Sequence, residues 1–325
     1  MRPCSISHYG FLTGCFTNRG FYFTSWYAII SSNKNYVAKL LEQGGDCMSY
    51  KIVCDSCTDL SIELKNNPNF CTVPLMLHVD GRDFIDDETF NQADFLAAMK
   101  ESSNCPKSSC PSPDAFMSHF DDADDIYVIT LSSQLSGSYN SACLAKDLYL
   151  EDHSDKNIVI IDSKSASVGQ TLIALKVDEL AKQGKTFDEV VPEVLTFRDE
   201  MGTKFVLESL DNLRKNGRLS NLQAIIANAL NIKPIMGATP EGTITKVDQA
   251  RGMKKALSVM AKVISEEVSD TEKKILGIAH CNCRERAELV KEEILKLKRF
   301  KDVFIVDTAG VSSLYANDGG IVVSY

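Results

Sequence analysis

The sequence lacks any long apolar run, and no segment approaches the roughly 18 residues that a membrane-spanning helix requires. It also lacks an excess of positive charge, because 35 Lys and Arg stand against 44 Asp and Glu, a formal net charge of −9. No basic stripe appears, so the sequence predicts no nucleic-acid partner. The lack of a long apolar run likewise predicts no stable membrane span. A hydrophobic content of 44% and a charged content of 24% are typical of a globular protein.

Three common motifs for nucleotide binding and catalysis are missing as well. Neither GxxxxGK[ST] nor GxGxxG occurs, so the sequence does not predict that the chain itself binds ATP or a dinucleotide, and no cofactor is expected. The serine-hydrolase motif GxSxG is also absent. A function for this chain therefore has to be sought in other arrangements of side chains.

Cysteine, in contrast, is abundant, with 11 residues scattered along the chain. Their odd number and the lack of a secretory disulfide framework predict reduced thiols and a cytoplasmic protein. Cys54 and Cys57 form a CxxC at the end of a predicted strand, which is where thioredoxin-like motifs lie. With Cys281 and Cys283 they could instead hold zinc, although CxC is an unusual half-site. We favour small buried residues over both alternatives and expect no metal.

Residues 1–47 differ from the rest of the chain. They contain the only tryptophan, Trp26, and show no sustained periodicity. Gln43 to Asp46 can be encoded by a purine-rich ribosome-binding sequence just before Met48. Our hypothesis is that Met48 is the native start and that residues 1–47 are a non-native leader. A genuine disordered extension is the alternative.

From residue 48 the pattern becomes regular, and β-rich runs are followed by turns and helices. The pattern predicts strands at 50–54, 71–79, 126–131 and 157–161, and helices at 91–100, 113–120, 139–150, 168–183 and 187–201. Strands that alternate with helices predict a parallel sheet covered on both faces. Ligands bind beyond the carboxyl ends of such strands, which is where we expect Asp55, Ser56, Ser136, Asp162 and Ser163.

The second half of the chain changes character. It predicts strands at 203–207, 232–236, 243–248 and 274–279 and near 303 and 321, with helices at 222–230, 253–268 and 284–297. We therefore predict an α/β fold of two domains. The N-terminal α/β domain, residues 48–200, would contain the parallel sheet and the ligand-binding loops, and the C-terminal α+β domain would comprise residues 201–325.

Two serine-rich loops carry the strongest functional signal. In the first, Ser136, Gly137 and Ser138 connect a predicted buried strand to a predicted helix. In the second, KSSCPS at 107–112, serines again precede a helix that begins at Pro113. Free backbone N–H groups and the positive end of a helix dipole favour anions at such turns, so the pair predicts a carboxylate or phosphate site. Each serine taken alone is more simply explained as a helix N-cap.

Six motifs make residues 48–325 similar to the DegV family. They are, in order along the chain, DSCTDL at 55–60, KSSCPS at 107–112, LSSQLSGSYNSA at 131–142, IDSKSASVGQ at 161–170, NGRLS at 216–220 and IKPI at 232–235. The sequence departs from the family pattern at Cys57, which stands in place of a hydroxyl residue. Residues 1–47 have no counterpart in the family, which agrees with a start at Met48.

The resemblance implies that two domains enclose a single long-chain fatty acid. Its carboxylate would be held by Ser108 and Ser136, with support from Gly137, Ser109 and Ser56. Family members of this kind are the fatty-acid-binding subunits of a two-part bacterial fatty-acid kinase, in which a separate ATP-using subunit phosphorylates the bound carboxylate. The resemblance thus implies a lipid-binding protein with no enzymatic activity of its own and an ATP-dependent kinase subunit as its partner.

Two further residues would face that kinase partner. Arg218, in NGRLS, matches a family arginine linked to the kinase or the acyl phosphate. Tyr315, in YANDGG, stands where kinase-coupled members often have the histidine of an HTGxG-type loop. Tyrosine donates a hydrogen bond but is not cationic, so we expect the change to affect the kinase partnership more than fatty-acid binding.

Two other functions stay open. The main alternative is an enzyme that acts on a small phosphorylated or carboxylated metabolite in the same cleft, and a CxxC redox protein is the third. The sequence does not specify the length or saturation of an acyl chain, nor an oligomeric state.

Overall fold

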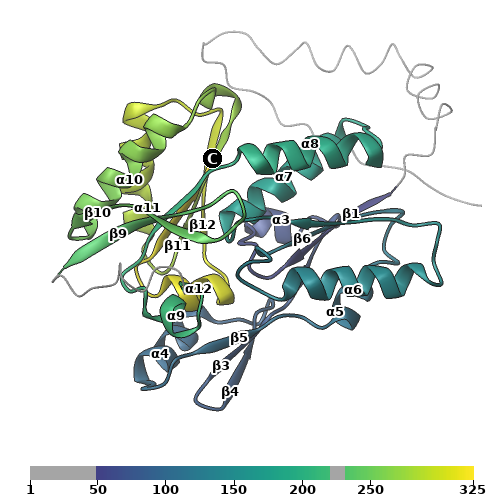
Figure 1. The fold of residues 1–325 in the computed structure, drawn as a ribbon, viewed down its shortest axis with the longest axis horizontal. Helices are drawn as coiled ribbons and strands as arrows, with labels where there is room; N and C mark the ends of the chain where they lie inside the picture. The colour runs from purple at the N-terminus through teal and green to yellow at the C-terminus, as the bar shows by residue number, and fades with distance from the viewer. Residues whose placement is uncertain (1–48, 220–230) are drawn as a thin grey trace, which may run out of the picture. The chain divides into compact units, whose positions relative to one another are not determined.

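Strands and helices alternate along the first half of the chain in the computed structural model, which describes residues 49–219 and 231–325 (Figure 1). The hypothesis of a leader at residues 1–47 and the predicted helix at 222–230 fall outside the described residues, as does Ser220 of the NGRLS motif. Met48–Tyr325 form one unit, within which two large sheets and one small sheet are arranged.

The first large sheet has four parallel strands in the order β2-β1-β6-β7. Its strands are β1 (Tyr50–Asp55), β2 (Phe70–Val73), β6 (Asp125–Thr130) and β7 (Asn157–Asp162). One face packs against α7 (Val168–Lys182) and α8 (Phe187–Glu200), and the other against α5 (Pro113–Met117) and α6 (Ser138–Leu150). Every residue of β6 is buried, as expected for a parallel strand between two helical layers.

The predicted strand at 71–79 is wrong as a single element. The first strand ends before Pro74, which has no N–H to donate to a neighbouring strand. The next strand, β3 (Met76–Val79), is not part of the parallel sheet. It pairs antiparallel with β4 (Arg82–Ile85) and β5 (Lys107–Ser109) in a three-stranded sheet of order β4-β3-β5. The first three residues of KSSCPS are therefore a strand and not part of a turn. The segment after DSCTDL forms a single short helical turn, α3 (Ile62–Lys65).

The second large sheet has six strands in the order β10-β9-β8-β13-β11-β12. Its strands are β8 (Thr203–Val206), β9 (Ile232–Ala238), β10 (Ile244–Arg251), β11 (Ile275–His280), β12 (Asp302–Asp307) and β13 (Ile321–Ser324). Only β11 and β12 run parallel, because β8 to β10 and β13 pair antiparallel with their neighbours. The helices α10 (Met253–Glu267) and α11 (Arg284–Leu297) cover one face.

The long helix α7 also reaches the six-stranded sheet. It contacts β1 and β6 of the parallel sheet and β11 and β13 of the other. Three short helices, α4 (Gln92–Glu101), α9 (Asp211–Lys215) and α12 (Gly310–Ala316), lie near the small sheet, and a 3₁₀ turn spans Thr271–Lys273. The predicted α/β class, with a parallel sheet and a second α+β half, is thereby confirmed. The boundary at residues 200 and 201 stays a prediction, although the two large sheets divide there.

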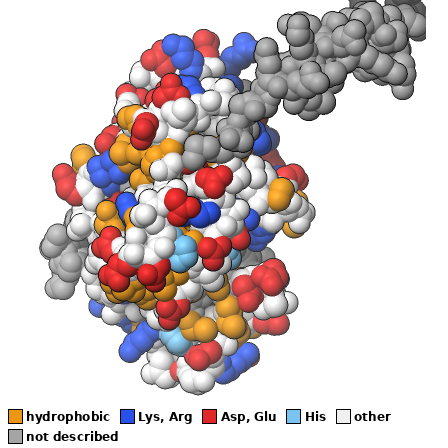
Figure 2. All heavy atoms as spheres, turned by 90° about the vertical axis from the view of Figure 1, so that its right-hand side faces the viewer, with side chains coloured by type: hydrophobic (Ala, Val, Ile, Leu, Met, Phe, Trp, Pro, Cys, Tyr) orange, Lys and Arg blue, Asp and Glu red, His pale blue; other side chains and the backbone are white. Residues whose placement is uncertain are grey.

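The surface carries charges of both signs. On the face shown in Figure 2, Lys and Arg side chains are interspersed with Asp and Glu. No helix among residues 49–219 and 231–325 combines the length and apolar character needed to cross a bilayer.

A buried carboxylate joins the parallel sheet to its helices and gives a test of the fold. Asp55, the last residue of β1, accepts hydrogen bonds from the Ser138 hydroxyl at 2.6 Å, the Leu131 N–H at 2.7 Å and the Gln170 amide at 2.8 Å. We expect Ser138→Ala to lower the free energy of unfolding by about 1–3 kcal/mol, because a buried anion loses a donor. Urea unfolding measures the loss. The exposed Ser154→Ala is the control, and equal stability of the two variants would contradict this role.

Candidate functional site

An apolar cavity lies between the parallel sheet and the six-stranded sheet. Its volume is about 780 Å³ when all atom-free space and the open mouth are counted. Its wall is overwhelmingly apolar and includes Leu131, Leu135, Phe205, Ile244 and Val322. The cavity lies where three hydrophobic clusters come together, one under α12 and α4, one under α9 and one beside α7.

The strand ends of the parallel sheet form one side of this cavity, as the sequence predicts for a ligand site. Leu131 and Leu135 come from the loop after β6, and residues 164–167 from the loop after β7. Ser167 adopts a φ of 58°, which is strained for a residue with a side chain, and its hydroxyl donates to the buried Asp59. This strained turn is thus held in place from behind the cavity wall.

The two serine-rich loops lie side by side. The Ser141 hydroxyl donates to the Pro111 carbonyl at 2.6 Å, which links the helix after one loop to the backbone of the other. A Cβ atom on Gly137 would lie 3.1 Å from the Cys110 Sγ, so glycine permits this approach. The sequence predicted an anion site in each loop, and the tertiary structure brings them together.

The N-cap interpretation holds for one loop only. Ser112 caps α5, because its hydroxyl accepts the Ala115 N–H at 3.3 Å. In the other loop Gly137 occupies the N-cap position of α6 and makes no side-chain cap. The half-buried Ser136 accepts the Ser138 N–H at 3.2 Å. Its hydroxyl hydrogen is available to a ligand, since this bond uses the oxygen only as an acceptor.

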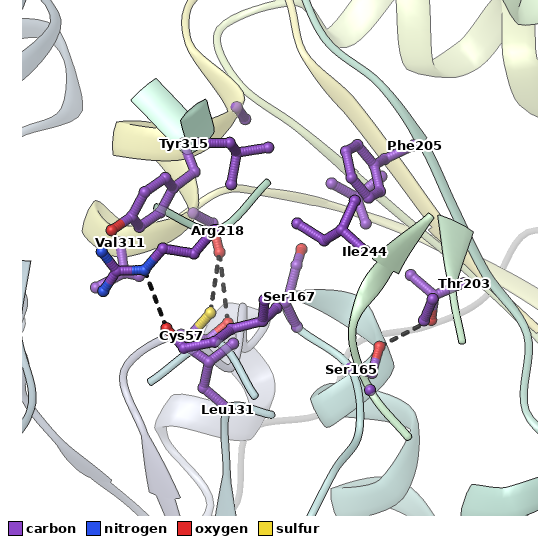
Figure 3. Close-up of a pocket in the computed structure, with 18 of the residues that line it drawn as sticks. Cys57, Leu131, Ser165, Ser167, Thr203, Phe205, Arg218, Ile244, Val311 and Tyr315 are labelled. Carbon is purple, nitrogen blue, oxygen red and sulfur yellow. Dashed lines mark hydrogen bonds between the residues drawn. The ribbon is translucent and has the colours of Figure 1, made fainter. Parts of the chain in front are cut away.

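Tyr315 and Arg218 lie at one end of the cavity (Figure 3), and Ser108, which is not part of the cavity wall, contacts Tyr315. The hydroxyls of Ser108 and Tyr315 share a hydrogen bond of 3.2 Å. The Arg218 guanidinium lies 5.7 Å from the centre of the Tyr315 ring, and its Nε donates to the Leu135 carbonyl at 3.1 Å. This end is therefore polar and carries a positive charge next to the residue that precedes Ser136.

Ser109 and Ser56 are placed elsewhere. Ser109 is exposed and its hydroxyl lies 3.2 Å from His78 Nε2, because successive residues of a strand point to opposite faces. Ser56 is buried, where its hydroxyl donates to Asp86 at 2.8 Å and accepts the Leu75 N–H at 3.0 Å. Like Ser108 and Ser136, neither residue belongs to the cavity wall, but Ser108 contacts Tyr315 and Ser136 follows Leu135, both of which do.

Two carboxylates hold the first turn of α12, and the sequence analysis missed both. Asp59 accepts the Ala309 N–H at 2.6 Å, and Asp86 accepts those of Gly310 at 2.6 Å and Val311 at 2.9 Å. A Cβ atom on Gly310 would lie 2.6 Å from the Asp86 carboxylate, so the close approach requires glycine. The available signal was an aspartate within DSCTDL and another directly after a short strand.

Burial opposes the charge on these carboxylates. Desolvation raises the pKa of Asp59 to about 7, although hydrogen bonds from Ser167 and the Ala309 N–H act in the opposite direction. Desolvation likewise raises the pKa of Asp86 to about 6. The pKa of Asp55 is raised for the same reason. The raised pKa values bring the titration of Asp59 and Asp86 close to neutral pH.

The thiols of the CxxC motif, Cys54 and Cys57, are buried and form no disulfide bond. Desolvation raises the pKa of both Cys54 and Cys57 well above the usual thiol value. A raised pKa disfavours the thiolate that redox and metal chemistry require. Within the part of the chain that the structure describes, no three His, Cys, Asp or Glu side chains gather as metal ligands would. Cys57 instead lies in the cavity wall, where a small apolar side chain fits.

The chain matches a known protein family over nearly all of its described length. Residues 49–325 match the family described as "Uncharacterised protein, DegV family". A DegV domain-containing protein of Streptococcus gordonii is 38% identical over 286 residues, which cover 86% of this chain and 99% of the relative.

Two solved structures are similar along the same stretch. A DegV family protein of Ruminococcus gnavus, refined with vaccenic acid, is 50% identical with a TM-score of 0.84, over 86% of this chain and 100% of that one. The Fatty Acid Kinase B3 protein of Streptococcus pneumoniae, loaded with linoleic acid, is 34% identical with a TM-score of 0.79, over 86% of this chain and 99% of that one.

The raised acid pKa values predict a pH dependence of stability. Folded Asp59 and Asp86 titrate near pH 7 and 6, whereas an unfolded aspartate titrates at about 3.9, so between these values the folded protein binds the extra protons. Their contribution to the free energy of unfolding is fully present in acid and is lost as the pH rises through 6 and 7. We expect Asp59→Asn to remove part of this fall, measured by urea unfolding between about pH 5 and pH 8. Asp147→Asn, at an exposed site, is the control, and an identical pH slope in all three proteins would refute the assignment.

Proposed function

The chain belongs to the DegV family, and from that premise we propose that it binds one long-chain fatty acid in the cavity between its two large sheets. The carboxylate lies at the end marked by Tyr315 and Arg218, where it reaches Ser108 and Ser136, with Gly137 allowing the two loops to approach. The acyl chain runs along the apolar wall toward Phe205.

The observation that carries this proposal is a cavity with an overwhelmingly apolar wall, one end of which holds the Tyr315 hydroxyl and the Arg218 guanidinium. Burial of roughly 14 methylenes at about 0.8 kcal/mol each gives about 11 kcal/mol of gross driving force. The loss of ligand freedom removes several kcal/mol of this. A buried carboxylate opposes binding unless its lone pairs find donors, and the hydroxyls of Ser108, Ser136 and Tyr315 are donors of that kind.

Other members of the family support the same proposal. The Ruminococcus gnavus protein was refined with vaccenic acid and the Streptococcus pneumoniae protein was loaded with linoleic acid. Both ligands combine one carboxylate with a long hydrocarbon chain, which is the chemistry of this cavity. Ser109 and Ser56 have no direct part in the proposed contact, since both hydroxyls bond elsewhere.

The chain itself is proposed to be a binding protein and not the kinase. A separate ATP-using subunit would phosphorylate the bound carboxylate and would approach at Arg218 and Tyr315, where the polar end of the cavity lies. The hydroxyl cradle leaves the carboxylate free of a direct ion pair, so it keeps its nucleophilic character. An enzyme acting on a small metabolite is less well supported, because a small polar substrate would leave most of the apolar wall without a partner.

Lipid extraction tests the proposal directly. Protein made from Met48 should yield one fatty acid per chain by mass spectrometry. Ser136→Ala and Ser108→Ala should each weaken the binding of added oleate by about tenfold to a hundredfold, because each removes a hydrogen bond to a charged group. Ser154→Ala, at an exposed site, should bind as the unmodified protein does.

Two results would contradict the proposal. An extract without lipid, together with no uptake of oleate or palmitate, would favour the metabolite enzyme. Normal oleate affinity in both serine variants would show that the carboxylate lies elsewhere in the cavity.

The kinase partnership has a separate test at Tyr315. A histidine here can carry a positive charge toward the carboxylate or the acyl phosphate, whereas the tyrosine is neutral. With a bacterial fatty-acid kinase subunit and ATP, Tyr315→His should form more acyl phosphate than the unmodified chain while oleate affinity changes little. Equal or faster turnover by the unmodified chain would show that the histidine is not needed for the partnership.

A further inference from the structure

Three apolar side chains on one face of the six-stranded sheet are only partly covered by protein. Phe205 lies on β8, Val322 is its direct partner on β13, and Ile244 begins β10. All three line the cavity and are half-buried, whereas Val206, the next residue of β8, is fully buried. Apolar groups inside a fold are normally packed on all sides, so the uncovered side of these three marks where a ligand's hydrocarbon fits.

These side chains lie away from the polar end. In Figure 3, Tyr315 and Arg218 are on one side of the cavity, and Phe205 and Ile244 are on the other. A fatty acid whose carboxylate reaches Ser108 therefore directs its methyl end toward Phe205. This direction rests on the proposed function.

The cavity wall next to Phe205 offers little room for movement, and it includes Thr203, two residues earlier on β8, and Ser165. Thr203 shares hydrogen bonds with Ser165 at 2.8 Å and with Ser324 at 2.9 Å, and all three hydroxyls are buried. A chain that pushed between them would leave buried hydroxyls without partners, at a cost in free energy. Behind Ser165 the packing is closed as well, because a Cβ atom on Gly169 would lie 2.1 Å from the Ser165 Oγ.

Phe205 is thus a bulky wall residue on the side of the cavity away from Tyr315 and Arg218, next to residues whose hydrogen bonds fix the wall. We propose that Phe205 is a specificity-determining residue, which sets the upper limit on the length of acyl chain that the cavity accepts. Its ring occupies space that additional methylenes of a longer fatty acid would otherwise fill, and Ile244 and Val322 form the floor beside it.

Competition between fatty acids tests this limit. The purified chain is stripped of lipid, incubated with an equimolar mixture of saturated acids from dodecanoic to eicosanoic acid, and its bound acids are measured by mass spectrometry. Phe205→Ala should shift the distribution to longer acids, by about fourfold in relative affinity for each methylene that the new space admits. Phe205→Leu should give a smaller shift in the same direction, and Ile244→Phe a shift to shorter acids.

Phe187→Ala is the matched control, because it deletes the same half-buried side chain on α8, where the ring packs on Tyr127 away from the cavity wall. Its distribution should equal that of the unmodified chain, and circular dichroism confirms that each variant is folded. An unchanged distribution in folded Phe205→Ala, or loss of all lipid from that variant alone, would overturn the assignment of Phe205. If the unmodified chain takes up none of the acids, the proposed function itself fails, which is a different result.

Discussion

The geometry of the site depends on the contact between two buried carboxylates and the first turn of α12. Asp59 and Asp86 belong to the N-terminal half, and together they accept three backbone N–H groups from residues 309–311. The helix that follows carries Tyr315 to Ser108, so this contact joins the two halves of the polar end. The contact has a cost, since burial raises the pKa of both acids toward neutrality. The same buried carboxyl groups hold the first turn of α12 in place through their hydrogen bonds, and α12 forms part of the cavity wall.

The cavity exists because the two large sheets are not packed directly against each other. The helix α7 contacts both, but the loop before it, residues 164–167, borders a space that is also lined by Leu131, Phe205 and Ile244. Its asymmetry follows from topology. The strand ends of the parallel sheet bring serine loops to one side, whereas the six-stranded sheet presents apolar side chains from its strand interiors. A ligand with one charged end and a long hydrocarbon chain matches both surfaces at once.

Individual residues show what local patterns indicate and what they leave open. Ser136 was selected because a buried strand, a Ser/Gly turn and a helix are visible as local periodicity, and its role as a carboxylate ligand stays a prediction. Ser109 and Ser56 were grouped with it because hydroxyls in loops look alike in a sequence. Which hydroxyl is free depends on neighbours far along the chain, namely His78 for Ser109 and Asp86 for Ser56. The strand at 71–79 was predicted as one element because its apolar pattern continues across Pro74, although the two halves join different sheets.

The sequence by itself determined the α/β class, most helices and strands of the described chain, the two serine loops and the family, because these depend on local periodicity, turn chemistry and motif order. Only the tertiary structure decided that the loops touch at Gly137 and Cys110, that Tyr315 reaches Ser108, and that Phe205 faces a cavity. The first two are contacts between residues distant in the chain. The third, the open side of Phe205, reflects a place where no other side chain packs. Such contacts depend on how helices and strands pack against one another. The periodicity of a single strand or helix does not specify which distant residues it will contact.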